Sequence, residues 1–143
     1  AFDALRNKET VLERWLARLS SITLPLARIG AAALFFQYGA RKIFGWFGGR
    51  VAEFGSQLWV AGMMEVLGAP LLALGLLTRP VAFLLSGEMA VAFWGSHVPR
   101  GPTVWPIQNG GEPAVLFCFL YLYLTAAGPG WFSLDRLCLK KLS

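Results

Sequence analysis

Long apolar runs alternate along the chain with short polar segments and with segments rich in glycine and proline. Four runs have the length and character of membrane-spanning helices, at residues 19–40, 57–77, 80–97 and 113–128. A bilayer core of about 30 Å needs about 20 helical residues, so the last two runs are slightly short. Local thinning of the bilayer or contact with partner subunits accommodates short spans. The pattern therefore predicts an all-α fold, a four-helix transmembrane bundle.

A different pattern occupies residues 1–18. Leu5, Leu12, Trp15 and Leu16 recur at helical spacing, and charged residues fill the positions between them. An apolar stripe opposite a charged face is typical of a helix that lies in the membrane interface. We expect an amphipathic interfacial helix here, with docking to a partner protein as the alternative. The predicted organisation is an N-terminal segment, 1–18, followed by a transmembrane domain, 19–143.

The connections between the runs differ in length. Only Thr78 and Arg79 separate the second run from the third, which predicts an antiparallel helical hairpin. The other two connections, residues 41–56 and 98–112, are longer. The prolines and glycines of residues 98–112 exclude a continuous helix there.

The amino-acid composition distinguishes a membrane protein from a soluble domain. Of the 143 residues, 56% are hydrophobic and 15% are charged, and the mean hydropathy is +0.55. A typical soluble domain has roughly 25% charged residues. A soluble domain of this size would expose large apolar patches, which are rare on soluble monomers. The composition therefore excludes a soluble domain.

The net charge of +5 arises from basic residues near the ends of the apolar runs. Eight Lys and Arg residues fall on the side that holds both termini and the turn at 78–79, and four fall on the other side. Cytoplasmic loops carry the excess of Lys and Arg, so both termini are predicted to be cytoplasmic. We expect no binding to nucleic acid, because no basic patch interleaves with aromatic residues in a polar context.

Three ionisable residues fall inside the predicted spans, namely Arg28, Glu65 and Glu88. Each would cost a few kcal/mol or more if it faced lipid, so we expect all three to turn inward and pair. A rise of 1.5 Å per residue puts Arg28 and Glu88 at about the same depth, with Glu65 about one turn higher. The sequence thus predicts one buried cluster around Arg28. It is either a neutral core that fixes helix packing or a polar site for a quinone head group, a proton or a small solute.

A second group of polar residues is expected at the outer face, where spans one and three end and span four begins. Its members are Gln37, Tyr38, Arg41, Lys42, His97 and Glu112. The single histidine excludes haem held by two histidines, and its spacing from the two cysteines gives no zinc motif. Motifs for nucleotide binding or for an activated serine are also missing. We therefore expect no metal site and no intrinsic cofactor.

Several ordered segments resemble the DoxX family of four-helix membrane proteins. They are ARIGAAALFFQYGARKIFGWFGG at 27–49, MEVLGAPLLALGLLTRPVA at 64–82, NGGEPA at 109–114 and GPGWFSLD at 128–135. The resemblance covers about residues 24–136 and implies a four-helix bundle. It carries over, as family-pattern positions, Arg28, Gly39, Lys42, Gly45, Glu65, Gly75, Glu112 and Asp135. Asp135 is expected either to cap the C-terminal segment or to pair with Arg79.

The resemblance also carries a functional implication. Members of the family are linked to membrane redox systems, including a quinone-reducing membrane subunit of thiosulfate oxidation. It implies an integral membrane subunit of a quinone-linked oxidoreductase complex in the bacterial inner (plasma) membrane, with a quinone as the candidate cofactor. The absence of a CxxC motif argues against a thiol relay. Whether the chain is itself catalytic stays open.

Two alternatives remain beside the redox interpretation. The chain is either a non-catalytic subunit that anchors a larger membrane assembly or a small-solute or proton-coupled transporter, the latter disfavoured by the absence of broken-helix repeats. An anchoring subunit would present its span-four aromatics to partner helices; these are Phe117, Phe119, Tyr121 and Tyr123. The expected partners are the lipid bilayer and either other membrane subunits or further copies of the chain.

Overall fold

The computed structural model describes the backbone of residues 2–142 and the side chains of residues 11–138. Every regular element in this part of the chain is a helix. The all-α prediction is therefore confirmed.

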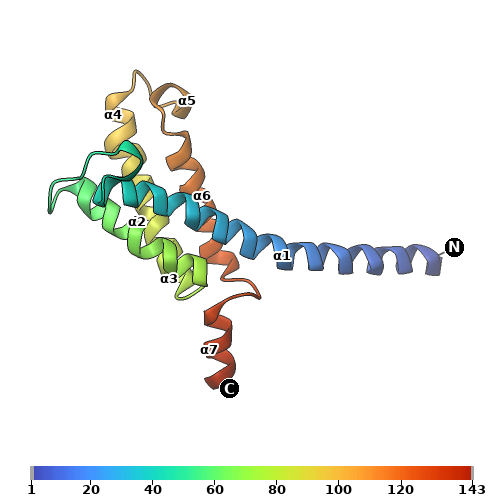
Figure 1. Ribbon diagram of the computed structural model, residues 1–143. Coiled ribbons are helices and arrows are strands. Elements are labelled where there is room, and N and C mark those ends of the chain that lie inside the picture. Colours follow the sequence, from blue (N-terminus) through green and yellow to red (C-terminus); the bar gives the residue numbers. More distant parts are fainter. Residues whose placement is uncertain (1, 143) are drawn as a thin grey trace.

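The first helix is much longer than a single span. Helix α1 runs without a break from Phe2 to Ile43 and is followed by a 3-10 turn, η1, Trp46–Gly48. Its 42 residues correspond to about 63 Å, roughly twice the thickness of a bilayer core. Its N-terminal half projects away from the other helices (Figure 1), and every side chain from residue 11 to residue 23 is exposed.

The separate interfacial helix expected for residues 1–18 is not present as an element. The backbone continues through residue 18 as part of α1, since nothing in that stretch interrupts the hydrogen bonds of the helix. Pro25 is the first proline inside α1, and it lies beyond the predicted boundary. The side chains of residues 1–10, on which part of the amphipathic pattern rests, lie outside the described residues.

Helices α2, Gln57–Leu74, and α3, Thr78–Ala92, form the predicted hairpin. The turn lies three residues earlier than expected, because Gly75 ends α2 in the left-handed conformation at φ 66°. Leu77 also has a positive φ, 51°, and precedes the first turn of α3. Thr78 and Arg79 therefore belong to α3 and not to the connection.

The third span is extended by a π-helical turn. Helix α3 passes through η2, Phe93–His97, directly into α4, Val98–Arg100. A short helix, α5, Pro106–Asn109, precedes α6, Glu112–Ala127, and the chain ends in α7, Leu134–Leu142. Single π turns inside α-helices are often found at functional sites.

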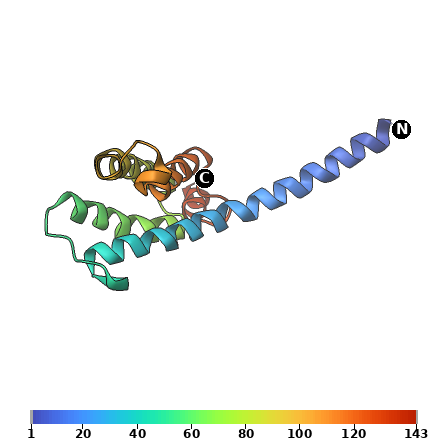
Figure 2. The same ribbon diagram turned by 90° about the horizontal axis from the view of Figure 1, so that it is seen from above.

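The helices pack as two pairs. α1 lies along α2, α3 lies along α6, and the α2–α3 hairpin joins the pairs. Figure 2 shows the two layers, with α1 and α2 in one and α3 and α6 in the other. The centre between the layers is fully buried and is formed by Phe35, Leu72, Leu85, Tyr121 and Leu124.

Three segments are long and apolar enough to cross a membrane, namely Val11–Ile43, Gln57–Leu74 and Thr78–Arg100. Only 28% of the most apolar window of each is buried within the bundle, so most of their apolar surface faces outward. Helix α6 is apolar but shorter, with 16 residues. The structure thus has three to four apolar helices that are compatible with a membrane bundle.

Candidate functional site

Helices α1 and α2 approach each other closely at two glycines. A Cβ atom on Gly39 would lie 2.8 Å from the Cβ of Glu65, and one on Gly62 would lie 2.9 Å from the Cβ of Lys42. Each glycine sits three residues before the charged residue of its own helix and opposite the charged residue of the other. Small residues permit such close packing of helices, and here they bring Lys42 beside Glu65.

An ion pair joins the two helices at this point. The Nζ atom of Lys42 donates a hydrogen bond to Oε1 of Glu65 at 2.6 Å. The Glu65 side chain is 1% exposed, whereas that of Lys42 is 22% exposed. The second carboxyl oxygen of Glu65, Oε2, is buried without a hydrogen-bond partner. Lys42 therefore satisfies only half of the Glu65 carboxylate.

The other helix pair contributes Glu88 from α3 and Tyr121 from α6. Both carboxyl oxygens of Glu88 and the hydroxyl of Tyr121 are buried, and no fixed donor or acceptor satisfies them while both acids are ionised. Glu88 lies within side-chain hydrogen-bonding reach of Glu65, so a proton held by either acid would join the two carboxyl groups, and Tyr121 lies near enough to both to interact with them electrostatically. Each main helix thus supplies one polar side chain to what we call the acid–lysine cluster: Lys42, Glu65, Glu88 and Tyr121.

The charges of the cluster do not balance by themselves. One ammonium faces two carboxyl groups, so the cluster carries one net negative charge when both acids are ionised. An uncompensated charge in an apolar interior is costly. One bound proton, held by either carboxyl group, makes the cluster neutral. The arrangement is therefore suited to binding and releasing a proton.

Aromatic rings from α1 and α6 surround the Tyr121 ring. The ring of Tyr121 contacts Phe35 edge to face at a centroid distance of 5.0 Å and stacks with Phe117 at 5.7 Å. Phe35 and Phe117 also contact each other at 5.3 Å. These contacts fix the direction of the Tyr121 hydroxyl and surround it with apolar atoms.

The prediction that Arg28 joins Glu65 and Glu88 is wrong. Arg28 is fully buried, but its guanidinium donates to the carbonyl oxygens of Pro129, Ala73 and Phe132, the last two at 3.3 and 2.7 Å. It lies about 21 Å before Lys42 along the axis of α1. The depth argument failed because free carbonyl groups at a helix end and in a loop bind a guanidinium as well as a carboxylate does.

Arg28 is part of a set of helix caps at the end of the bundle where α2 meets α3. Asp135 accepts hydrogen bonds from the backbone N–H groups of Leu77 and Thr78, at 2.7 and 2.9 Å. Arg79 donates to the carbonyl oxygens of Thr125 and Ala126, both at 3.0 Å. Asp135 therefore caps the start of α3, and Arg79 caps the end of α6. The alternatives expected for Asp135, a cap on its own segment or a pair with Arg79, are both replaced.

The outer-face group is not a single site. Lys42 belongs to the acid–lysine cluster, and His97 is half-buried, with Nδ1 3.3 Å from the carbonyl oxygen of Asn109. The remaining members are exposed; they are Gln37, Tyr38, Arg41 and Glu112. Among the described side chains, no hydrogen bond or ion pair joins the six residues to one another.

The aromatic residues of the fourth span divide between two faces. Phe117 and Tyr121 are buried, whereas Phe119 and Tyr123 are 65% and 59% exposed. The prediction that all four face outward is thus wrong for the first two. Tyr121 is also the cluster member that the sequence interpretation missed. The spacing of Phe117 and Tyr121 could have indicated this position, because residues four apart lie on the same face of a helix.

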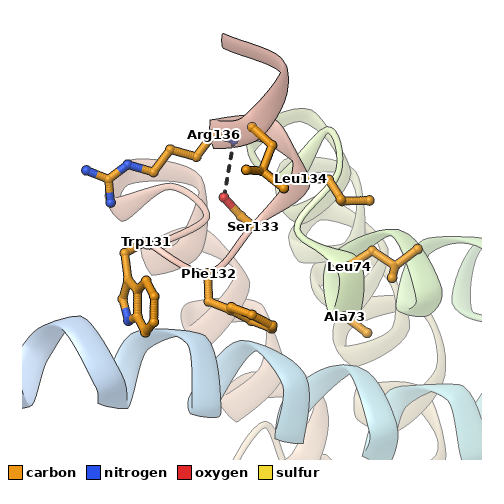
Figure 3. Close-up of a pocket in the computed structure, with 8 residues that line it drawn as sticks. Ala73, Leu74, Trp131, Phe132, Ser133, Leu134 and Arg136 are labelled. Atoms are coloured by element: carbon orange, nitrogen blue, oxygen red, sulfur yellow. Dashed lines mark hydrogen bonds between the residues drawn. The ribbon is translucent and has the colours of Figure 1, made fainter. Parts of the chain in front are cut away.

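A separate groove lies beside α7, near the buried Arg28. Its volume is about 510 Å³, and its walls come from the end of α2 and from residues 131–137. Figure 3 shows Phe132 and Ser133 in the centre, Ala73 and Leu74 on one side, and Trp131 and Arg136 on the other. The groove is remote from the acid–lysine cluster, since Ala73 lies about 12 Å beyond Glu65 along α2.

The fold and the cluster define an integral membrane protein with a polar cluster buried among its main helices. The chain matches the family model DoxX over residues 23–98, more than half of its length. The chain belongs to the DoxX family, as the sequence motifs indicated.

Two relatives align along most of their length. An "Uncharacterized protein" of Haemophilus influenzae is 42% identical in an alignment of 123 positions that covers 82% of this chain and 92% of the relative. "Inner membrane protein YphA" of Escherichia coli is 33% identical in an alignment of 126 positions that covers 80% of this chain and 89% of the relative. No solved structure shows significant similarity to the chain.

Proposed function

We propose that this chain is a membrane subunit of a quinone-linked redox assembly and that the acid–lysine cluster is its proton-exchanging site. One observation carries the proposal. Glu65, Glu88 and Tyr121 hold four buried polar atoms without hydrogen-bond partners, beside a single lysine. Structural ion pairs are normally satisfied, and ionisable groups inside a membrane protein usually mark a site of function.

The side chains of the cluster fit the chemistry of a quinone. When bound, a quinone supplies two carbonyl oxygens that accept two electrons and two protons. The Tyr121 hydroxyl, which has no hydrogen-bond partner, and a protonated Glu88 would donate hydrogen bonds to such oxygens. Lys42 holds the Glu65 carboxyl group in place. This chain would contribute the protons, and the electrons would have to come from a redox partner subunit.

The proposed location is the bacterial inner membrane, with both termini in the cytoplasm. The Escherichia coli relative carries the name of an inner membrane protein. The excess of Lys and Arg on the side of the termini supports the orientation. The acid–lysine cluster then lies toward the outer leaflet, because α1 reaches Lys42 only at its C-terminal end.

Purification from native membranes in mild detergent or nanodiscs tests the proposal first. Mass spectrometry and an ultraviolet–visible spectrum of the product should show redox subunits or bound quinone. A cofactor-free homo-oligomer without partners would overturn the assignment to a redox complex.

A substitution separates proton exchange from assembly. Glu88→Gln keeps the size of the side chain and removes its proton exchange, so quinone-dependent electron transfer should fall by about 10²-fold while the complex still assembles. Glu53→Gln, at an exposed loop position, is the matched control. Unchanged electron transfer in the Glu88→Gln variant would show that the cluster is structural.

A second candidate, an anchoring subunit, is favoured by the exposed surface of the bundle. The projecting part of α1 and the outward rings Phe119 and Tyr123 have no cover in this chain. In that case Phe119→Asp should release partner subunits, and Glu88→Gln should change neither assembly nor electron transfer.

A further inference from the structure

The groove beside α7 has the size and walls of a ligand site. Its volume of about 510 Å³ falls within the range of about 300–1,000 Å³ that is usual for small-molecule pockets. The walls are mostly apolar and include exposed rings and aliphatic chains. Trp131, Phe132 and Leu137 are 55%, 63% and 62% exposed.

The floor of the groove is held rigidly by buried polar contacts. Arg28 binds the carbonyl oxygens of Ala73, on one side of the groove, and of Phe132, in its centre. The N–H group of Asp135 donates to the carbonyl oxygen of Gly75 at 2.9 Å, and the Asp135 carboxylate caps α3. A groove fixed in this way loses little entropy when a ligand enters, which favours binding.

The rim of the groove is basic. Arg136 is exposed, and no carboxylate among the described residues pairs with it. Figure 3 shows its side chain extending from α7 on the same side of the groove as Trp131. The acidic residue next to it, Asp135, already accepts two backbone hydrogen bonds. Lys140 and Lys141 follow in the sequence of α7, so this end of the chain favours an anionic partner.

The position of the groove matches the polar surface of a bilayer. It lies at the end of the bundle that bears the α2–α3 turn, where the apolar spans stop. Tryptophan is enriched at this level of a membrane, and amphipathic basic helices such as α7 lie in the interface. A molecule that enters from this level has a charged head beside an apolar tail.

We propose that the groove binds an anionic phospholipid, with the phosphate at Arg136 and one acyl chain along Leu74, Phe132 and Leu137. The charge of the rim selects the head group, and the apolar walls select an amphiphile over a free anion. This site does not depend on the redox function proposed above. It would tie α7 to the membrane surface.

Native mass spectrometry of the full-length protein, titrated with phosphatidylglycerol or with phosphatidylcholine, tests the proposal. Phosphatidylglycerol should bind more tightly. Arg136→Gln should weaken its binding by about fivefold, which corresponds to about 1 kcal/mol for one basic residue at an anionic surface, and should leave phosphatidylcholine unaffected. Leu74→Trp fills the groove and should weaken both lipids.

Arg50→Gln is the matched control, because Arg50 is exposed in the loop before α2, at the other end of the bundle. Equal weakening by Arg50→Gln and Arg136→Gln would reduce the effect to general surface charge and overturn the site. Displacement of the lipid by inorganic phosphate alone would identify an anion site without an acyl chain, and it would also overturn the proposal. So would a co-purifying protein that is lost with Leu74→Trp while lipid binding persists.

Discussion

Lys42 is the residue on which the charge balance of the interior depends. Among the described side chains, it is the only cation paired with a buried carboxyl group, through the bond of 2.6 Å to Glu65. Removing one partner of a buried ion pair costs more than the pair contributes, because the remaining charge is left in an apolar environment.

Lys42→Met should therefore lower the free energy of unfolding by about 3 kcal/mol. Adding Glu65→Gln should restore most of the loss, since the uncompensated carboxylate is then gone. Thermal unfolding in detergent, followed by tryptophan fluorescence, measures both effects. Arg41→Met, at the exposed neighbouring position, should change little. A double variant as unstable as the single one would contradict the pairing.

Substitution of Tyr121 should affect stability and electron transfer differently. Its hydroxyl is buried without a partner, so Tyr121→Phe removes an unsatisfied polar group from the interior. The variant should be as stable as the original chain or more stable, by up to about 1 kcal/mol. If the hydroxyl serves the proposed proton exchange, the same variant should lower electron transfer. A large loss of stability would instead indicate a hydrogen bond that this conformation does not contain.

The residues also show how far the sequence alone could lead. Because the membrane interior is apolar, the sequence predicts that Glu65 and Glu88 turn toward the centre of the bundle, and both do. The basic partner of Glu65 could not be predicted. Arg28 and Lys42 are both cations of α1, and the sequence does not show that loop carbonyl groups satisfy Arg28. Which of the two cations pairs with Glu65 depends on tertiary contacts that Arg28 makes with residues 101 and 104 positions further along the chain.

At the scale of elements, the close contact between α1 and α2 depends on a glycine, Gly39, which has no side chain. A Cβ on Gly39 would lie 2.8 Å from both the Cβ of Glu65 and the backbone nitrogen of Val66. Backbone atoms cannot move aside as a flexible side chain does, so the two helices would have to separate.

Gly39→Ala should accordingly destabilise the bundle and weaken the Lys42–Glu65 pair, although alanine normally favours a helix by about 1 kcal/mol over glycine. Gly30→Ala is the matched control in the same helix, because a Cβ there meets nothing within 4 Å. It should be neutral or slightly stabilising. Equal effects at the two positions, in thermal unfolding, would argue against the close contact.

Helix ends could be predicted less well than helix interiors. The apolar runs predicted the positions of the apolar helices, and the hairpin of α2 and α3 was expected, but its turn lies three residues earlier, at Gly75. The start of α3 is capped from outside its own segment by Asp135, and such a cap leaves no local pattern in the sequence.

Removal of this cap gives a test at the same scale. Asp135→Ala leaves the N–H groups of Leu77 and Thr78 without their acceptor and should cost about 1 kcal/mol or more of unfolding free energy. Asp135→Asn keeps one acceptor oxygen and should recover part of the loss. Thermal unfolding compares the two variants, and an Asn variant no better than Ala would contradict the capping role.

At the scale of the whole molecule, the two ends of the bundle differ in their polar contacts. Backbone caps by Arg28, Arg79 and Asp135 close the end that bears the termini. The acid–lysine cluster lies toward the other end, where Lys42 is partly exposed. Sequence reasoning predicted the membrane class and the all-α fold, while this division emerged only from the packing of α1 on α2 and of α3 on α6.

The orientation in the membrane can be read from a natural cysteine. Cys138 is exposed in α7, on the side predicted to be cytoplasmic, whereas Cys118 is half-buried in α6. A membrane-impermeant maleimide should label Cys138 in inverted membrane vesicles and not in intact cells, with Cys138→Ser as the control. Labelling in intact cells would reverse the proposed orientation.

The length of α1 has a mechanical consequence. One continuous helix carries both the projecting N-terminal half and Lys42, and between them Pro25 lies against Gly130. Proline removes one backbone hydrogen bond, so bending is easiest there. A force on the projecting half is therefore transmitted along a single rod, with Pro25 as its pivot, to the lysine that neutralises the interior. Displacement of the projecting half and protonation of the cluster would then act on the same helix.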